Sequence, residues 1–264
     1  MRSLSILVHG LSKTGKTWLG DTSPAPRLVL DAEGGNRFTS SRKVVWDPTQ
    51  AEPPKADGTW DTCLVFVRDF ATIQSAYQWL AAGQHPFKSV VVDSISEVQQ
   101  RCVDSLVGTD PMKMQNWGDL LRQMSDLVRK LRDLTIHPTN PLEAIVIIAM
   151  TRKVGDDRYV PYVQGQLATT LPYYIDVTGY FFTQAGDQGL ERKMLVAPHP
   201  QFEAGDRTGR LGDVDDAGRL TGVITAPNVE KMLDQIYGPR TQSGAAEGAP
   251  AAAPTTDRGT TKGQ

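Results

Sequence analysis

Residues 10–17 carry a pattern of glycine, lysine and threonine that suits phosphate binding. Gly10, Gly15, Lys16 and Thr17 occupy the fixed positions of G-x-x-x-x-G-K-[ST]. Gly10 lets the chain turn sharply, and Gly15 lets backbone N–H groups approach a polyphosphate with no Cβ in the way. Lys16 supplies charge for the β- and γ-phosphates of ATP, and the Thr17 hydroxyl can bind Mg²⁺. The predicted nucleotide-binding residues are Gly10, Leu11, Ser12, Lys13, Thr14, Gly15, Lys16, Thr17 and Trp18.

The segments on either side of this motif favour a phosphate loop over a chance glycine turn. Ser3 to His9 is mostly apolar, which is typical of a buried parallel strand. A helix is predicted to begin at Lys16, and its positive end would face the bound anion. The run Ser23-Pro24-Ala25-Pro26 should end this helix early.

Asp93 is a candidate ligand for Mg²⁺, together with Thr17. It ends the run KSVVVDS, whose three valines predict a strand covered on both faces. Such a strand can deliver one acid beside the phosphate-loop strand, where Asp93 could hold the metal and Ser94 could bond to a metal-bound water. The alternative is that Asp93 caps the next helix, because Asp and Ser are good N-caps.

Glu33 is the first candidate for a catalytic base. It follows the apolar strand Arg27 to Asp31, in a glycine-rich turn. A carboxylate there can accept a proton from an attacking water while Lys16 and Mg²⁺ stabilise the developing charge. The alternative is an exposed turn residue. Asp31 is the second candidate for the base and Glu97 the third.

Composition restricts the class of protein. A formal net charge of −2 over 264 residues gives no bulk attraction to nucleic acid, so binding would need a local basic patch. Cys63 and Cys102 fit no metal spacing, which favours free thiols in a reducing cytosol. No segment approaches the ~18 apolar residues of a membrane span. We expect a cytoplasmic protein with no membrane contact.

The rest of the chain predicts one α/β domain over residues 1–238 and a disordered tail over 239–264. The tail has no large apolar residue and cannot offset the entropy of ordering. An apolar stripe along 118–134 indicates a helix packed on the core. Further expected strands are Cys63–Val67 and Ala144–Met150, with antiparallel edge strands near 180–183 and 193–196 and a last helix at 229–237.

Three segments, VHGLSKTGKTWL, LVLDAEGG and SVVVDSISEV, together resemble the ATPase core of RecA-like recombinases. The sequence is most similar to phage-encoded RecA-like P-loop ATPases of the single-strand annealing and recombination group. VPYVQGQLATTLPYYIDVTGYFF and FEAGDRTGRL support this resemblance, which spans roughly Leu4 to Gly212. It implies an α/β fold with a mostly parallel central sheet, flanking helices and antiparallel edge strands, and a nucleotide at the carboxyl ends of the strands.

The same resemblance implies further site residues. It assigns the catalytic glutamate to Glu33, and it places a polar sensor after AIVIIAM, where Thr151 is the candidate. Arg207, with Arg210, is a candidate finger that would complete a neighbouring subunit's site in a ring or filament. Gly205 stands where the family pattern has a lysine, so a solvated basic turn is the alternative.

The resemblance also implies binding of single-stranded DNA by a mobile loop after the sensor strand. Residues 152–174 fit that position and mix cations with aromatic rings, which suits stacked bases. The alternative is that the tyrosines pack this loop against the sheet. The candidate DNA-binding residues are Arg152, Lys153, Arg158, Tyr159 and Tyr162.

The function that we predict is Mg²⁺-dependent ATP hydrolysis, stimulated by single-stranded DNA, in phage recombination or annealing. The expected partners are DNA, further copies of the chain and a single-strand binding protein, in the host cytoplasm. The alternatives are a helicase-loader-like assembly ATPase and a P-loop phosphotransferase. The latter would need a compact arginine-rich lid, which the sequence lacks.

Overall fold

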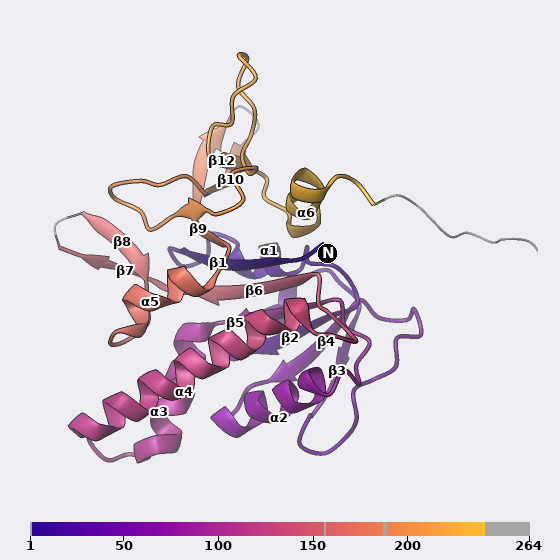
Figure 1. Cartoon of the computed structure of the whole chain (residues 1–264), viewed down its shortest axis with the longest axis vertical. Coiled ribbons are helices and arrows are strands. Elements are labelled where there is room, and N and C mark those ends of the chain that lie inside the picture. Colours follow the sequence, from indigo (N-terminus) through magenta and orange to yellow (C-terminus); the bar gives the residue numbers. More distant parts are fainter. Residues whose placement is uncertain (1, 156, 187–188, 241–264) are drawn as a thin grey trace, which may run out of the picture.

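The computed structural model describes residues 2–155, 157–186 and 189–240. Most of the predicted tail, from residue 241 onward, lies outside these residues. One large sheet runs through the described chain, with helices on both faces (Figure 1). The mostly parallel sheet, the flanking helices and the antiparallel edge confirm the predicted fold class.

The sheet has the order β12-β10-β9-β1-β6-β5-β2-β4-β3, and β11 also pairs with β9. The pairs from β9 to β3 are parallel, whereas β10, β11 and β12 add antiparallel pairings at one edge. The strands of this sheet are β1 Leu4–Gly10, β2 Arg27–Asp31, β3 Lys43–Val45, β4 Thr62–Phe66, β5 Ser89–Asp93, β6 Ala144–Ala149, β9 Val177–Gly186, β10 Gly189–Leu195, β11 Gly205–Asp206 and β12 Val223–Thr225.

Helices cover the two faces of the sheet unequally. Three long helices, α2, α3 and α4, pack on one face, while α1 and α6 lie on the other (Figure 1). The helices are α1 Lys16–Gly20, α2 Phe70–Ala81, α3 Ile95–Val107, α4 Met114–Asp133, α5 Leu167–Tyr174 and α6 Val229–Tyr237, with short 3₁₀ turns at Asn36–Phe38 and Leu134–Ile136.

The sheet has one hydrophobic core on each face. Side chains of the buried strands point alternately into the two cores, which explains their continuous apolar sequences. In β5, Val90 and Val92 face the core under the long helices, whereas Val91 faces the core under α1 and α6. The α4 stripe, including Met124 and Leu131, is buried in the first of these cores. Its assignment to core packing is confirmed.

The strand that delivers Asp93 is separated from the phosphate-loop strand by one other strand. β5, which ends at Asp93, does not lie directly beside β1, because β6 is inserted between them and pairs with both. All three strands are parallel, so their carboxyl ends still open on the same edge of the sheet. The acid of β5 therefore reaches the phosphate loop across one intervening strand.

The predicted mobile loop over residues 152–174 is also wrong in its secondary structure. β7 Thr151–Val154 and β8 Arg158–Pro161 form a separate two-stranded antiparallel sheet. Helix α5 follows and packs Leu167 and Leu171 into the core. The β-branched and aromatic residues Thr151, Val154, Tyr159 and Val160 favour strands here, whereas the glycines at 155 and 165 lie outside both strands and the helix.

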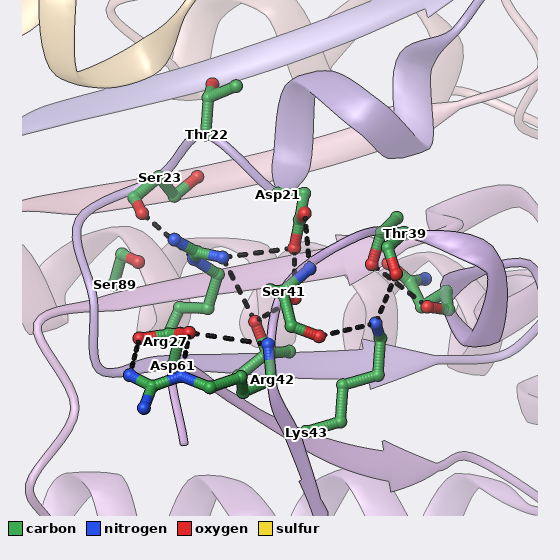
Figure 2. Close-up of polar contacts among 12 residues, drawn as sticks. Asp21, Thr22, Ser23, Arg27, Thr39, Ser41, Arg42, Lys43, Asp61 and Ser89 are labelled. Carbon is green, nitrogen blue, oxygen red and sulfur yellow. Dashed lines mark hydrogen bonds and ion pairs between the residues drawn. The ribbon is translucent and has the colours of Figure 1, made fainter. Parts of the chain in front are cut away.

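A buried polar cluster lies where α1 ends and β2 begins, with β4 alongside (Figure 2). The Arg27 guanidinium donates to Asp21 Oδ1 and to Thr62 Oγ1, at 3.0 Å each, and to the Ser23 carbonyl at 2.9 Å. Asp21 also accepts a hydrogen bond of 2.6 Å from Ser41 Oγ. The cluster fixes the end of α1 against the amino ends of two strands.

We expect Asp21→Ala to lower the free energy of unfolding by about 3–5 kcal/mol, because it leaves the Arg27 charge buried without a counter-ion. Both side chains of this pair are only 9% exposed. The control is Asp126→Ala, which breaks the exposed pair with Lys130 and should cost less than about 1 kcal/mol. Urea unfolding measures both. Equal losses for the two variants would contradict a structural role of the buried pair.

Candidate active site

Close packing at Gly10 and the backbone conformation at Gly15 explain the two glycines of the phosphate loop. A Cβ added at Gly10 would lie 2.2 Å from the Phe181 carbonyl oxygen, so β9 leaves room only for glycine. Gly15 has φ +110°, a conformation that side chains other than glycine's rarely adopt. Lys16 Nζ donates to the carbonyls of Gly10 and Leu11 at 2.9 and 2.8 Å, so its ammonium lies within the loop.

Asp93 meets the phosphate loop directly. The Thr17 hydroxyl donates to Asp93 Oδ2 at 2.7 Å, and Asn36 Nδ2 donates to the same oxygen at 3.0 Å. Burial, reinforced by the charges of Glu33 and Asp31, raises the Asp93 pKa to about 6, although the hydrogen bonds oppose the shift. The alternative role as a helix cap falls to Ser94, whose Oγ accepts from the Glu97 backbone N–H.

Glu33 lies at the same site. Its carboxylate accepts a hydrogen bond from the Ser94 hydroxyl, and it lines the same pocket as Lys16. Asp31, by contrast, accepts from the backbone N–H groups of Gly34 and Asn36 and so holds the turn that carries Glu33. Glu97 pairs with Arg101 at 2.9 Å. Of the three candidate bases, Glu33 is the one that lines the pocket.

The pocket has a volume of about 540 Å³, within the range of small-molecule sites. The sequence did not predict some of its lining side chains, among them Phe38 and Arg192. Phe38 lies in the 3₁₀ turn after β2 and lines the pocket, and Arg192, on β10, reaches the phosphate loop from a distant segment. The expected residues that line it are Gly10, Leu11, Ser12, Lys13, Gly15, Lys16, Thr17, Trp18, Glu33, Asp93 and Thr151.

The candidate sensor Thr151 contacts a buried histidine. Thr151 Oγ1 lies 3.0 Å from His9 Nδ1 and 3.1 Å from the Val160 carbonyl oxygen. His9 Nε2 lies 2.7 Å from the Glu203 carbonyl. Burial, with a smaller effect of the Lys16 charge, lowers the His9 pKa to about 4, so the ring is neutral at pH 7 and Nε2 donates. His9 thus joins β1 to the β7–β8 hairpin.

The candidate finger residues lie away from the pocket of their own chain. Arg207 donates to the Tyr173 carbonyl at 3.0 Å and lies 3.5 Å from Asp176, with its side chain 60% exposed. Arg210 donates to the Ile236 carbonyl at 2.7 Å. Both residues are exposed. The role of Arg207 in a neighbouring subunit stays a prediction.

The five candidate DNA-binding residues divide into two groups. Lys153 pairs with Asp157, and Arg158 pairs with Glu203, so both cations are matched by carboxylates. Tyr159 stacks on Phe202 with ring centroids 5.6 Å apart, and it belongs to the packing of this face.

Arg152 and Tyr162 make up the second group. The Arg152 guanidinium lies 5.9 Å from the Tyr162 ring centroid, and Tyr162 is 40% exposed. No ion pair joins Arg152 to any residue in the described part of the chain. Of the five candidates, this pair best keeps the charge and the ring face that single-stranded nucleic acid would need.

The oxygen donors of the site fit Mg²⁺, which prefers few carboxylates together with phosphate oxygens. Thr17 Oγ1 and Asp93 Oδ2 lie 2.7 Å apart beside a loop shaped for phosphate. Among residues 2–155, 157–186 and 189–240, no three His, Cys, Asp or Glu side chains form a metal cluster of their own. A metal at this site would therefore depend on oxygens from the nucleotide.

The fold and this site define an α/β P-loop NTPase. A family model described as "AAA domain" matches residues 2–208, and the chain belongs to that family of ATPases. No curated protein matches the sequence significantly. None of the described helices has both the length and the apolar character needed to span a membrane.

One solved structure that is similar to this chain is that of a KaiC-like protein from the hyperthermophilic archaeon Pyrococcus horikoshii OT3. Its likeness to this chain has a TM-score of 0.40 and 12% sequence identity, over 77% of this chain and 82% of that chain. A TM-score at this level carries no argument about function. The class rests on the strand order, the phosphate loop and the family match.

We expect Asp93→Asn to raise the free energy of unfolding at pH 7 by about 1–3 kcal/mol, because it removes a desolvated charge. The folded pKa of about 6 lies above the ordinary 3.8, so the ionised carboxylate destabilises the fold above pH 6. As the pH falls toward 4, Asp93 becomes protonated and the advantage of the variant should vanish.

Urea titrations without Mg²⁺ at several pH values measure this difference. Asp126→Asn, at an exposed helix position, is the control and should show no such trend. A difference between wild type and Asp93→Asn that grows on acidification would contradict the raised pKa.

Proposed function

We propose that the protein hydrolyses ATP in a Mg²⁺-dependent reaction that is stimulated by single-stranded DNA. The observation that carries the proposal is the convergence of four side chains on one pocket. Lys16 and Thr17 come from the start of α1, Asp93 from the end of β5 and Glu33 from the turn after β2. This set supplies a cation, two oxygen donors for a metal and a general base, which is the set that hydrolysis of a phosphoanhydride needs.

Each side chain has a separate task in this proposal. Lys16 neutralises charge on the β- and γ-phosphates, and Mg²⁺ held by Thr17 and Asp93 would add to that neutralisation. Glu33 orients the attacking water and accepts its proton. Ser94, which donates to the Glu33 carboxylate, restrains the direction of that carboxylate. Ser94 is thus a positioning residue rather than a metal-water contact.

We expect Glu33→Gln to retain ATP binding and to lower the hydrolysis rate about 100-fold or more, because the amide cannot accept the proton. Lys16→Ala should weaken nucleotide binding or turnover. The control is Glu97→Gln, whose side chain pairs with Arg101 and should leave the rate close to wild type. Phosphate release and ATP titration measure the two effects separately. Near-normal turnover by Glu33→Gln would move the base elsewhere, most directly to Asp31.

The DNA part of the proposal is supported by the Arg152–Tyr162 pair, whose tyrosine ring is exposed, and by its connection to the site. β7 begins at Thr151, which lines the phosphate pocket and lies 3.0 Å from His9 on the phosphate-loop strand. A nucleic acid that stacks on Tyr162 and pairs with Arg152 would therefore bind an element that touches the nucleotide site. The resemblance to phage RecA-like ATPases adds the context of recombination or annealing.

We expect single-stranded DNA to raise the ATPase rate of wild type, and Arg152→Ala combined with Tyr162→Ala to weaken DNA binding about tenfold or more. The basal rate should be retained. Arg129→Ala is a matched control, because Arg129, on α4, likewise lies near an aromatic ring, 5.8 Å from that of Tyr174. Unchanged hydrolysis with DNA, together with phosphorylation of a small molecule, would favour a phosphotransferase. Stimulation only by a partner helicase would favour a loader.

The proposed function also includes assembly of several copies of the chain. Arg207 is exposed and remote from the pocket of its own chain, as a finger acting on a neighbour must be. A ring or filament on DNA would bring such a residue to the next phosphate loop. This role is inferred from the resemblance together with the exposure of Arg207.

A further inference from the structure

Arg192 lies over the phosphate loop although it is far from the loop in sequence. A Cβ added at Gly15 would lie 2.6 Å from Arg192 Nε and 2.9 Å from its Cδ. The Arg192 guanidinium carbon also lies 5.9 Å from the centroid of the Trp18 ring. Arg192, Gly15 and Trp18 therefore form one edge of the nucleotide pocket, and all three residues line it.

Strand pairing fixes the Arg192 backbone, while its guanidinium is available to bind a ligand. Arg192 pairs with Thr183 on β9, and its carbonyl accepts from the Ala226 N–H at 2.9 Å. Within residues 2–155, 157–186 and 189–240, no hydrogen bond or ion pair joins its guanidinium to another residue. The neighbouring Lys193, in contrast, lies 3.3 Å from Glu191. A guanidinium held at an anion-binding loop is suited to phosphate.

The strand order decides which phosphate this is. Asp93 ends β5 and Glu33 follows β2, both on one side of β1, whereas Arg192 lies on β10, two strands from β1 on the other side. A nucleotide with its γ-phosphate near the two acids extends its other end toward β9 and β10. Trp18 directly follows the Lys16-Thr17 pair and lies near Arg192, on the β10 side of the loop.

We propose that Arg192, supported by Trp18, binds the α-phosphate end of the nucleotide in the same subunit. This inference rests on the proposed nucleotide site. Because ATP and ADP both have an α-phosphate, Arg192 would strengthen the binding of both. A γ-phosphate contact would instead favour ATP over ADP. Arg192 is therefore a binding residue for the phosphates shared by substrate and product, distinct from Lys16 and Glu33 at the reacting end.

The test is calorimetric titration of the full chain with Mg²⁺–ADP and with a Mg²⁺ complex of a non-hydrolysable ATP analogue. Arg192→Ala should weaken both ligands by a similar factor, about 10-fold to 100-fold, because a charge-assisted contact common to both is lost. Arg192→Lys should restore part of the affinity. Lys193→Ala, on the same strand and paired with Glu191, is the matched control and should bind both ligands as wild type does.

Three results would overturn the inference, and they are separable from failure of the proposed function. ADP affinity of Arg192→Ala within twofold of wild type excludes the contact. A loss confined to the ATP analogue assigns Arg192 to the γ-phosphate instead. Equal losses in Lys193→Ala indicate an effect of the strand and not of the guanidinium. Failure of wild type itself to bind either nucleotide would overturn the proposed function as well. Should Arg192→Ala unfold, Arg192→Gln preserves the packing and gives the same comparison.

Discussion

The hydrogen bond from Thr17 to Asp93 is the contact on which the site depends. It joins the first turn after the phosphate loop to the end of β5, across the inserted strand β6. The contact requires β1, β6 and β5 to be parallel and to end at the same level, which their paired registers provide. The buried apolar strands set those registers, so the core of the domain determines the geometry of the polar edge.

The same edge concentrates groups that are unfavourable for stability. Asp93, Asp31 and Glu33 lie near one another, and burial raises the Asp93 pKa to about 6. Lys16 is also desolvated, which lowers its pKa, although the nearby acids oppose the shift. Such an arrangement is costly without a ligand and becomes favourable when cation and polyphosphate compensate the charges. The buried Asp21–Arg27 pair secures the other end of α1.

Local motifs predicted the phosphate loop, Asp93 and Glu33, because residue type and spacing within one strand–turn unit carry that information. They did not place β6 between β1 and β5, since strand order depends on pairing between distant segments. The β7–β8 hairpin was expected as a mobile loop, because its charges and glycines obscured its few β-branched and aromatic residues. Arg192 and His9 were missed because their neighbours, Gly15 and Thr151, come from remote parts of the sequence.

The most direct test of the central claim is a crystal structure with Mg²⁺ and a non-hydrolysable ATP analogue. The account predicts the γ-phosphate beside Lys16, the metal in contact with Thr17 and near Asp93, and a water between Glu33 and the γ-phosphate. A nucleotide bound elsewhere, or a γ-phosphate out of reach of Glu33, would contradict the account.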